Sequence, residues 1–291
     1  MKKTIIKLFV CCLVFLLTAV VVNKFMNRGH DNLTMEMAPA SYPLVTMVMG
    51  GVECNQLHGY SQAMDMAFQR DAVTVLGEGR DAGFVVDTYG AQVQGRSIQG
   101  RSADGTRLIE DTEVTDYVRT EGQISGNIAL KDLIDRDTEY LLTILLTLKD
   151  EGQIAYYTRV IWSDSLHVEE KLAFCLDFHQ RLYDKEAARE LTKYLESNAR
   201  LEDNSSFHKV NIYSSFRQIT WGDLGVQEIG KPMLRLTEIG EQTASILTDY
   251  MVATSEDRET TYYRMQEYYR LRYTVDRIYL HSYERTMTQI P

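Results

Sequence analysis

Hydrophobic residues form one continuous run at the start of this chain and short, interrupted runs afterwards. Residues 5–22 contain a single charged residue, Lys7. At about 1.5 Å of rise per residue, an α-helix of this length spans roughly 27 Å, close to the thickness of a bilayer core. The pattern therefore predicts a cytoplasmic stub and transmembrane helix within residues 1–28, followed by a linker at residues 29–43.

The residues around this run predict its orientation. Three lysines precede or begin the run, and Lys24 and Arg28 follow it. This bias favours an N-terminus in the cytoplasm and the bulk of the chain outside. A cleaved signal peptide is the alternative, but the run ends without an Ala-x-Ala pattern. Lipidation at Cys11 is a third reading, and Cys11 comes too early for an apolar run to precede it.

Residues 44–163 alternate between short β-prone runs and turn residues. The apolar run at residues 140–148 is typical of a central strand, and Gly152 belongs to the turn that leads into the next strand. Asp104-Gly105 predicts a hairpin, whereas residues 53–71 are expected to be irregular. Strands at such short intervals, with no helix between them, predict a β-sandwich.

A glycine-rich segment, residues 77–83, follows a β-prone run as in a dinucleotide site. Such a site requires a helix next, and residues 84–86 are β-prone instead. The segment is therefore interpreted as a connection between two strands.

From residue 164 onwards the apolar spacing becomes helical. Ser165 is the expected cap of a first helix, and Asp184 that of a second. Further strands are expected over residues 209–221, 233–252 with a break near Gly240, 261–275 and 278–287. Two helices followed by long antiparallel strands that form a curved sheet predict an α+β domain at residues 164–291.

The net charge of the chain limits the kinds of partner that it can bind. Beyond residue 30 the chain has 26 basic and 41 acidic residues, a net charge of −15. So acidic a segment argues against binding nucleic acid. Outside the anchor only Cys54 and Cys175 occur, in different predicted domains, so a disulfide between them is possible but not expected.

No pattern of residues indicates catalysis, a cofactor or a metal. The histidines lack zinc spacing, and there is no Gly-x-Ser-x-Gly elbow. His179 lies on the apolar helical stripe and is interpreted as a partly buried, hydrogen-bonded histidine. The chain is therefore predicted not to be an enzyme.

Tyrosines and arginines crowd the end of the chain and suggest two possible sites. Alternation over residues 261–275 places Tyr263, Tyr269 and Tyr273 on one face of a strand and Arg264, Arg270 and Arg272 on the other. Exposed tyrosine and arginine favour a protein interface, although a cation–aromatic lattice that only builds the sheet is the alternative. The candidate partner surface comprises Tyr262, Arg264, Tyr268, Arg270 and Arg272. A pocket enclosed by the sheet is the other possibility, lined by His179, Tyr194, Tyr269 and Tyr273.

Two stretches carry a resemblance, residues 140–161 and 276–287. They resemble the N-terminal region of long, uncharacterised single-pass envelope proteins of clostridia-like Gram-positive bacteria. The resemblance implies continuation into a further β-rich domain and no particular activity. The first domain looks like a fibronectin type III sandwich, and the second is similar to the cone-shaped fold of the ketosteroid isomerase superfamily.

These features together predict a non-enzymatic protein of the cell membrane, with one membrane pass and most of its mass extracytoplasmic. It is expected to bind, scaffold or sense in the cell envelope. Its partner would be another protein or its own C-terminal continuation. A small-molecule-binding or catalytic second domain and a structural stalk for a further domain are the alternatives.

Overall fold

The computed structural model describes Thr18 and residues 42–65, 71–131, 134–149, 152–198, 200, 206–256 and 259–290. The predicted anchor and linker lie outside the described residues, apart from Thr18 and residues 42–43. Within the described parts of the chain, no helix has both the length and the apolar character that a membrane crossing requires. Residues 42–291 form one compact unit.

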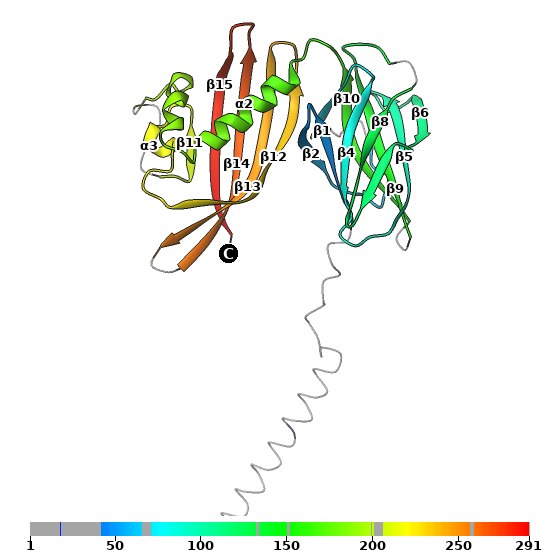
Figure 1. Cartoon of the computed structure of the whole chain (residues 1–291), viewed down its shortest axis with the longest axis horizontal. Helices are drawn as coiled ribbons and strands as arrows, with labels where there is room; N and C mark the ends of the chain where they lie inside the picture. Colours follow the sequence, from blue (N-terminus) through cyan, green and yellow to red (C-terminus); the bar gives the residue numbers. More distant parts are fainter. Residues whose placement is uncertain are drawn as a thin grey trace, which may run out of the picture. The chain divides into compact units, whose positions relative to one another are not determined.

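This unit is mostly β, with two open mixed sheets and a few short helices (Figure 1). The ten-stranded sheet has the order β11 (Lys209–Asn211), β15 (Ile278–Ile290), β14 (Glu259–Tyr273), β13 (Thr243–Glu256), β12 (Val226–Ile239), β2 (Val52–Leu57), β1 (Leu44–Met49), β4 (Asp81–Asp87), β8 (Gln123–Ala129), β7 (Tyr117–Thr120). The five-stranded sheet has the order β3 (Val73–Leu76), β10 (Gly152–Trp162), β9 (Glu139–Leu148), β5 (Val93–Ser102), β6 (Leu108–Glu113). The helical segments are α2 (Val168–Arg181), the 3-10 helix η2 (Ala187–Tyr194) and α3 (Phe216–Ile219).

The first hydrophobic core lies between the two sheets. It combines Met47 and Phe84 of the ten-stranded sheet with Leu142, Ile144 and Tyr156 of the other, all at most 2% exposed. The inward residues of β9 and β10 alternate along each strand, as expected for layers that bury one face. The hairpin at Asp104-Gly105 is present, as predicted. The glycine-rich segment 77–83 connects two strands, as predicted, although β4 already begins at Asp81.

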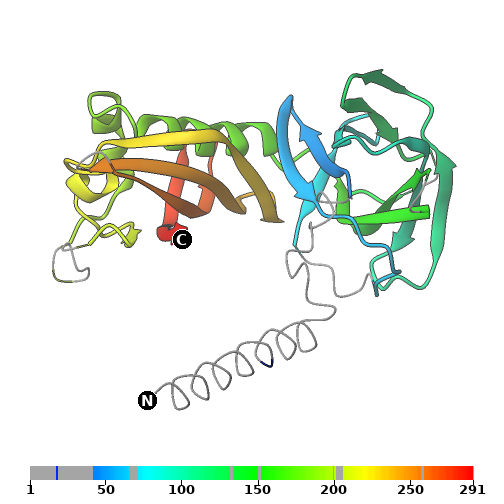
Figure 2. The same cartoon turned by 90° about the horizontal axis from the view of Figure 1, so that it is seen from below.

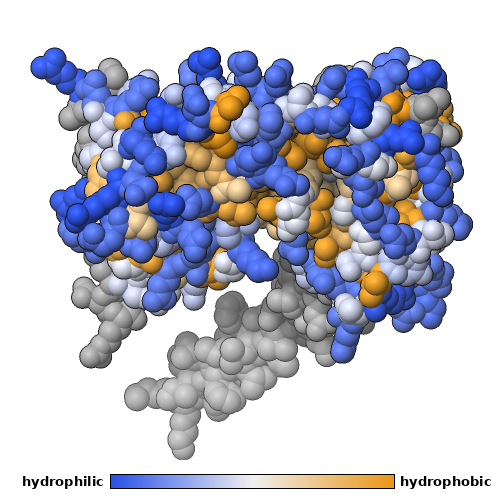
Figure 3. Space-filling view, turned by 45° about the horizontal axis from the view of Figure 1, so that its top comes forward, coloured by the Kyte–Doolittle hydropathy of each residue, from blue (hydrophilic) through white to orange (hydrophobic). Residues whose placement is uncertain are grey.

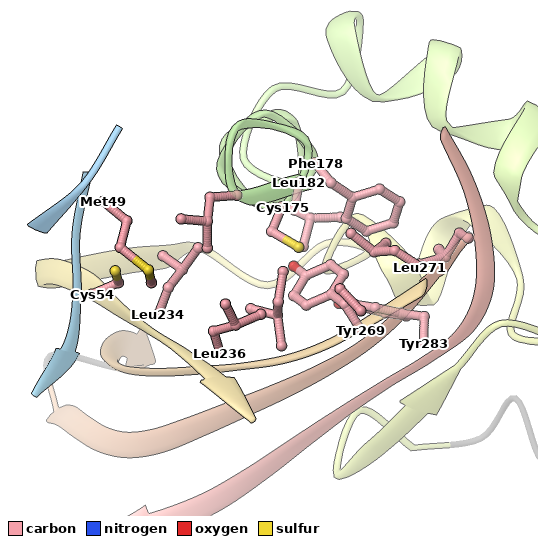
Figure 4. Packing of buried hydrophobic residues seen from close by; sticks show 14 of the residues in the cluster. Met49, Cys54, Cys175, Phe178, Leu182, Leu234, Leu236, Tyr269, Leu271 and Tyr283 are labelled. Atoms are coloured by element: carbon pink, nitrogen blue, oxygen red, sulfur yellow. The ribbon is translucent and has the colours of Figure 1, made fainter. Parts of the chain in front are cut away.

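The second core lies between α2 and strands β12 to β15, and Figure 2 shows the helix along one side of this sheet. The core continues to Met49 of β1, Cys54 of β2 and Val73 of β3. Cys175 and Phe178 of α2 face Leu236, Tyr269 and Leu271 of the strands (Figure 4). The predicted break near Gly240 separates β12 from β13, and β14 and β15 lie close to their predicted positions. Cys54 and Cys175 are both buried free thiols, and burial raises the pKa of Cys54 to about 12.

Three local predictions were wrong. Residues 52–57 form β2 rather than irregular structure, because their backbone pairs with β1. Ser165 does not cap α2, since the residue before the helix is His167, in a left-handed conformation. Residues 209–221 form only the short β11 and then α3, which begins with a capping box between Ser215 and Gln218.

Hydrophilic residues predominate on the face drawn in Figure 3, and hydrophobic residues reach the surface mainly in a band across its middle. Large exposed apolar side chains elsewhere are scattered, such as Val118 and Val275. This distribution agrees with the net charge of −15 beyond residue 30.

Asn55 joins segments that are far apart in the sequence. β2 meets β12 at the Cys54–Leu234 bridge, and Asn55 follows with a positive φ of 53° and no exposure. Its Nδ2 donates to the carbonyl of Val73 at 2.8 Å, and its Oδ1 accepts from the amide of Leu236 at 2.8 Å. The side chain therefore ties β2, β3 and β12 together, and asparagine tolerates this backbone conformation better than most residues.

We expect Asn55→Ala to lower the free energy of unfolding by about 2–4 kcal/mol, because it strands two buried backbone groups and places alanine at positive φ. Denaturant titration measures the change. Asn127→Ala is the control, since the Asn127 amide bonds to Asp81 in a half-buried position, and it should cost about 1 kcal/mol or less. Equal costs for the two variants would contradict this role of Asn55.

Candidate functional site

A row of polar residues crosses the buried face of the second sheet. Thr248 of β13 pairs with Glu267 of β14, which pairs with Arg285 of β15. All three residues are at most 1% exposed. Strand alternation turns this row towards α2, where neighbouring rows are apolar. Burying a carboxylate here is costly unless it is hydrogen-bonded and its charge is balanced.

Four donors surround the Glu267 carboxylate. Its Oε1 accepts from the hydroxyls of Tyr250 at 2.9 Å and Tyr283 at 3.0 Å. Its Oε2 accepts from the hydroxyl of Tyr269 at 2.6 Å and lies 3.0 Å from Nδ1 of His179. The two oxygens thereby use about four acceptor positions, the full capacity of a carboxylate.

The three tyrosines act only as donors in this arrangement. Burial, followed by the negative charge of Glu267, raises the pKa values of Tyr250, Tyr269 and Tyr283 well above the ordinary value. Their hydroxyls therefore keep their protons over the physiological range. Figure 4 shows Tyr269 and Tyr283 on the sheet, beneath Phe178 and Cys175 of α2.

Arg285 supplies a positive charge beside Glu267. Its side chain is fully buried and lies over the Trp221 ring, with the guanidinium carbon 3.5 Å from the ring centre. Its two terminal nitrogens donate to the carbonyls of Ile219 and Gln218 at 2.8 Å each. Arg285 thus satisfies the end of α3 and balances the buried carboxylate at the same time.

His179 links the buried carboxylate to a second one nearer the surface. Its Nε2 lies 3.0 Å from Oε1 of Glu228, whose side chain is 26% exposed. Burial lowers the pKa of His179, but the hydrogen bonds and charges of Glu267 and Glu228 outweigh burial and leave it raised. The imidazolium then donates from both nitrogens. Glu228, His179, Glu267 and Arg285 form a chain of alternating charge, here called the charge chain.

The same interactions act on Glu267. Burial raises its pKa, but the hydrogen bond and charge of His179, the charge of Arg285 and the Tyr269 hydroxyl lower it below the ordinary value. Glu267 is therefore ionised at neutral pH. The buried pair is stable because every charge has an oppositely charged neighbour and hydrogen-bonding partners.

One end of the charge chain opens into a cavity of about 600 Å³ between α2 and β12. Its lining consists of Leu176, His179, Gln180, Tyr183, Glu228, Gly230, Lys231 and Pro232. The strand itself makes this space: Ile229 and Met233 of β12 pair with residues only two apart on β13, so residues 230–232 bulge out. Gly230 has φ of 78°, which glycine adopts without strain.

The four residues of the predicted pocket do not converge. His179 lines the cavity, and Tyr269 shares Oε2 of Glu267 with it but is fully buried. Tyr194 packs edge-on against Phe174, with ring centres 5.1 Å apart. Tyr273 stacks on His167 at 4.0 Å, away from the charge chain.

The residues of the predicted partner surface lie together on the opposite face of β14. There Arg264 pairs with Asp249 at 3.1 Å, and Arg270 pairs with Glu238 at 2.6 Å. The Tyr268 hydroxyl lies 3.3 Å from Oγ of Ser245. Tyr262 and Arg272 are exposed. Two of the three arginines are therefore already neutralised by carboxylates of neighbouring strands.

Sequence reasoning missed Glu267, Glu228, Arg285, Tyr250 and Tyr283. A signal existed for Glu267, which falls between Met265 and Tyr269 on the face that the alternation assigns to the core. Its partners come from other strands, so their approach depends on pairing over long distances. Within the described residues, no group of three histidine, cysteine or acidic side chains is placed to hold a metal ion.

Comparison with known proteins identified no relative of this chain. The chain matches no protein-family model, and no curated protein is significantly similar to it.

The charge chain predicts a pH-dependent stability. Because the folded-state pKa of His179 is raised above its ordinary 6.5, its contribution is complete below about pH 6.5 and is lost as pH rises through the folded value. Glu267 has a lowered pKa, so its contribution is complete above its ordinary 4.5 and is lost on acidification. The contribution of His179 should therefore make the unfolding free energy of the wild type fall as pH rises above 6.5, by up to about 1.4 kcal/mol per pH unit.

His179→Gln removes the titrating group and should be less stable than the wild type at pH 6. Its stability should change less with pH above 6.5, so the two curves converge as pH rises. Parallel curves for the wild type and the variant would show that His179 is not charged in the folded protein.

Proposed function

We propose that this chain is a non-enzymatic binding module, held at a cell membrane by its N-terminal segment, with a small zwitterionic ligand in the cavity between α2 and β12. The carrying observation is that buried Glu267 fixes a charged His179 in the wall of this cavity, with Glu228 and Lys231 beside it. The tether rests on the apolar run at residues 5–22.

Binding fits the geometry better than catalysis. A histidine that serves as a general base needs a free ring nitrogen facing the reacting proton. Both nitrogens of His179 have carboxylate partners at 3.0 Å, which favour the doubly protonated form. Among the described residues that line the cavity, there is no serine, threonine or cysteine that could act as a nucleophile.

The opposite charges at the cavity favour a zwitterion such as a free amino acid. Glu228 is partly exposed and can accept from an ammonium group. Lys231 is exposed and, among the described residues, makes no ion pair, so it can bind a carboxylate. Leu176, Tyr183 and Pro232 provide apolar area for a side chain. The volume of about 600 Å³ lies within the range of small-molecule sites, about 300–1,000 Å³.

Two finer statements on the fold accompany this proposal. Residues 44–163 are proposed as a fibronectin type III-like sandwich, supported by the two layers that enclose the first core. Residues 164–291 are proposed as an α+β domain that resembles the cone-shaped fold, supported by α2 against the antiparallel strands β12 to β15. The charge of −15 beyond residue 30 supports a protein without a nucleic-acid partner.

Calorimetric titration of the full chain with glycine, alanine, leucine and glutamate tests the ligand, with acetate and methylamine as half-ligands. We expect an amino acid to bind more tightly than either half-ligand. Glu228→Gln and Lys231→Met should each weaken it about tenfold, as expected for the loss of one charge-assisted contact.

The matched controls are Glu284→Gln and Lys209→Met, which remove a surface pair 3.3 Å apart on β15 and β11. Both should bind like the wild type. Absence of binding by all four amino acids, or equal weakening by the control variants, would reject the proposed ligand site.

The tether predicts the location of the chain in cells. The full chain should sediment with membranes and resist extraction by high salt, whereas a chain lacking residues 1–28 should be released in soluble form, because the apolar anchor is gone. A protease added to intact protoplasts should digest the full chain. A freely soluble full chain, or one protected in intact protoplasts, would reject this arrangement.

A further inference from the structure

A second hollow lies on the other half of the unit, on the outer face of the five-stranded sheet, and has a volume of about 510 Å³. Its floor consists of outward side chains of β5, β9 and β10, opposite the face that packs in the first core. The segment 60–65 forms one wall, and the hairpin turn at residues 104–106 forms the other. This hollow is here called the sheet groove.

Hydrogen bonds fix the first wall. The backbone of Tyr60 pairs with that of Ala155 in β10 through two bonds of 2.9 Å, and the amide of Met64 donates to the Tyr157 hydroxyl at 3.1 Å. Gly59 allows this close approach, because a Cβ there would come within 2.6 Å of Ile154 Cγ2. The rings of Tyr60 and Tyr157 lie 5.9 Å apart at 46°, with both side chains partly exposed.

The second wall is equally well defined. The Asp104 carboxylate accepts from the hydroxyls of Ser102 and Thr106 and from the amide of Thr106 at 3.1 Å. These bonds lower the pKa of Asp104 to about 2. The carboxylate is therefore engaged within its own turn, and both walls are formed before any ligand arrives.

The floor carries hydrogen-bonding groups in one row. Tyr157 of β10 is opposite Thr143 of β9, which is opposite Gln99 of β5. Gln99 continues the row by donating to Asp111 of β6 at 3.0 Å. Gln153 and Arg101 extend the polar surface on either side, whereas Ala155 and Leu145 are the apolar residues of the floor.

The groove differs chemically from the cavity at α2. The charged residues of the lining are Arg101, Asp65 and Asp104, one positive and two negative, so the groove does not attract a polyanion. Most of the remaining groups are amides and hydroxyls, which can both donate and accept hydrogen bonds. The polar floor is unsuited to an apolar chain, and the two tyrosine rings provide flat surfaces at one side.

From these features we infer that the sheet groove binds a neutral oligosaccharide. A pyranose ring presents hydroxyl groups around its edge and a face of C–H bonds, which match the amide and hydroxyl row and the tyrosine rings respectively. Tyrosine suits such a ligand because it combines apolar area with a polar end. This site is independent of the proposed amino-acid site, and its test uses different residues.

The experiment titrates the full chain, in a detergent without a sugar headgroup, with maltotetraose, cellotetraose and chitotetraose, and with heparin as a polyanion. At least one neutral tetrasaccharide should bind at millimolar concentration or below. Tyr157→Ala should weaken binding about tenfold through the lost ring contact. Gln153→Ala, at an exposed position where the fold is not at risk, should weaken it severalfold.

Tyr279→Ala is the matched control, since it removes an exposed tyrosine from β15 and should leave the affinity unchanged. Glu228→Gln should also have no effect on sugar binding, which separates this inference from the proposed amino-acid site. The inference is overturned if none of the three tetrasaccharides binds, if heparin binds more tightly than all of them, or if binding survives both Tyr157→Ala and Gln153→Ala.

Discussion

The second half of this protein depends on one ionised carboxylate that is completely buried. Glu267 lies on β14, between β13 and β15 and under a helix, and is fully buried. An isolated buried carboxylate would cost several kcal/mol and would take up a proton instead. Here three tyrosines and a histidine saturate its oxygens, and Arg285 lies beside it. The cost is thereby offset only when all the contributing strands are in register.

Because of this requirement, the charge chain fixes the positions of these strands and of the helix relative to one another. Tyr250, Glu267 and Tyr283 come from three different strands, and His179 comes from the helix. A slip of one residue in any strand would turn its side chain to the outer face and leave the carboxylate short of a donor. Apolar contacts beneath α2 tolerate small displacements, whereas hydrogen bonds of 2.6–3.0 Å do not. The network therefore specifies the arrangement that the apolar core stabilises.

Sequence patterns predicted the parts of the fold that depend on local rules. The alternation of β14, the Asp104-Gly105 hairpin and the break near Gly240 follow from strand period and turn chemistry, and all are present. The prediction of a strand over residues 209–221 was wrong. The capping box at Ser215 favours a helix there, which the pattern of apolar residues did not indicate. The residues of the charge chain were harder to predict from the sequence. His179 was expected to be buried and hydrogen-bonded, but its partners Glu228 and Glu267 lie 49 and 88 residues further along the chain.

The Asn55 side chain also connects the two halves of the unit, which bears on function. Its amide group bonds to β3 and to β12, and Arg159 of β10 donates to the carbonyl of Thr237 in β12 at 2.5 Å. The Asn55 bonds are buried and the Arg159 bond is partly buried, and the bonds to Val73 and Thr237 link the five-stranded sheet to the ten-stranded sheet. A ligand held in the sheet groove and one held at α2 would then be kept in a fixed relation.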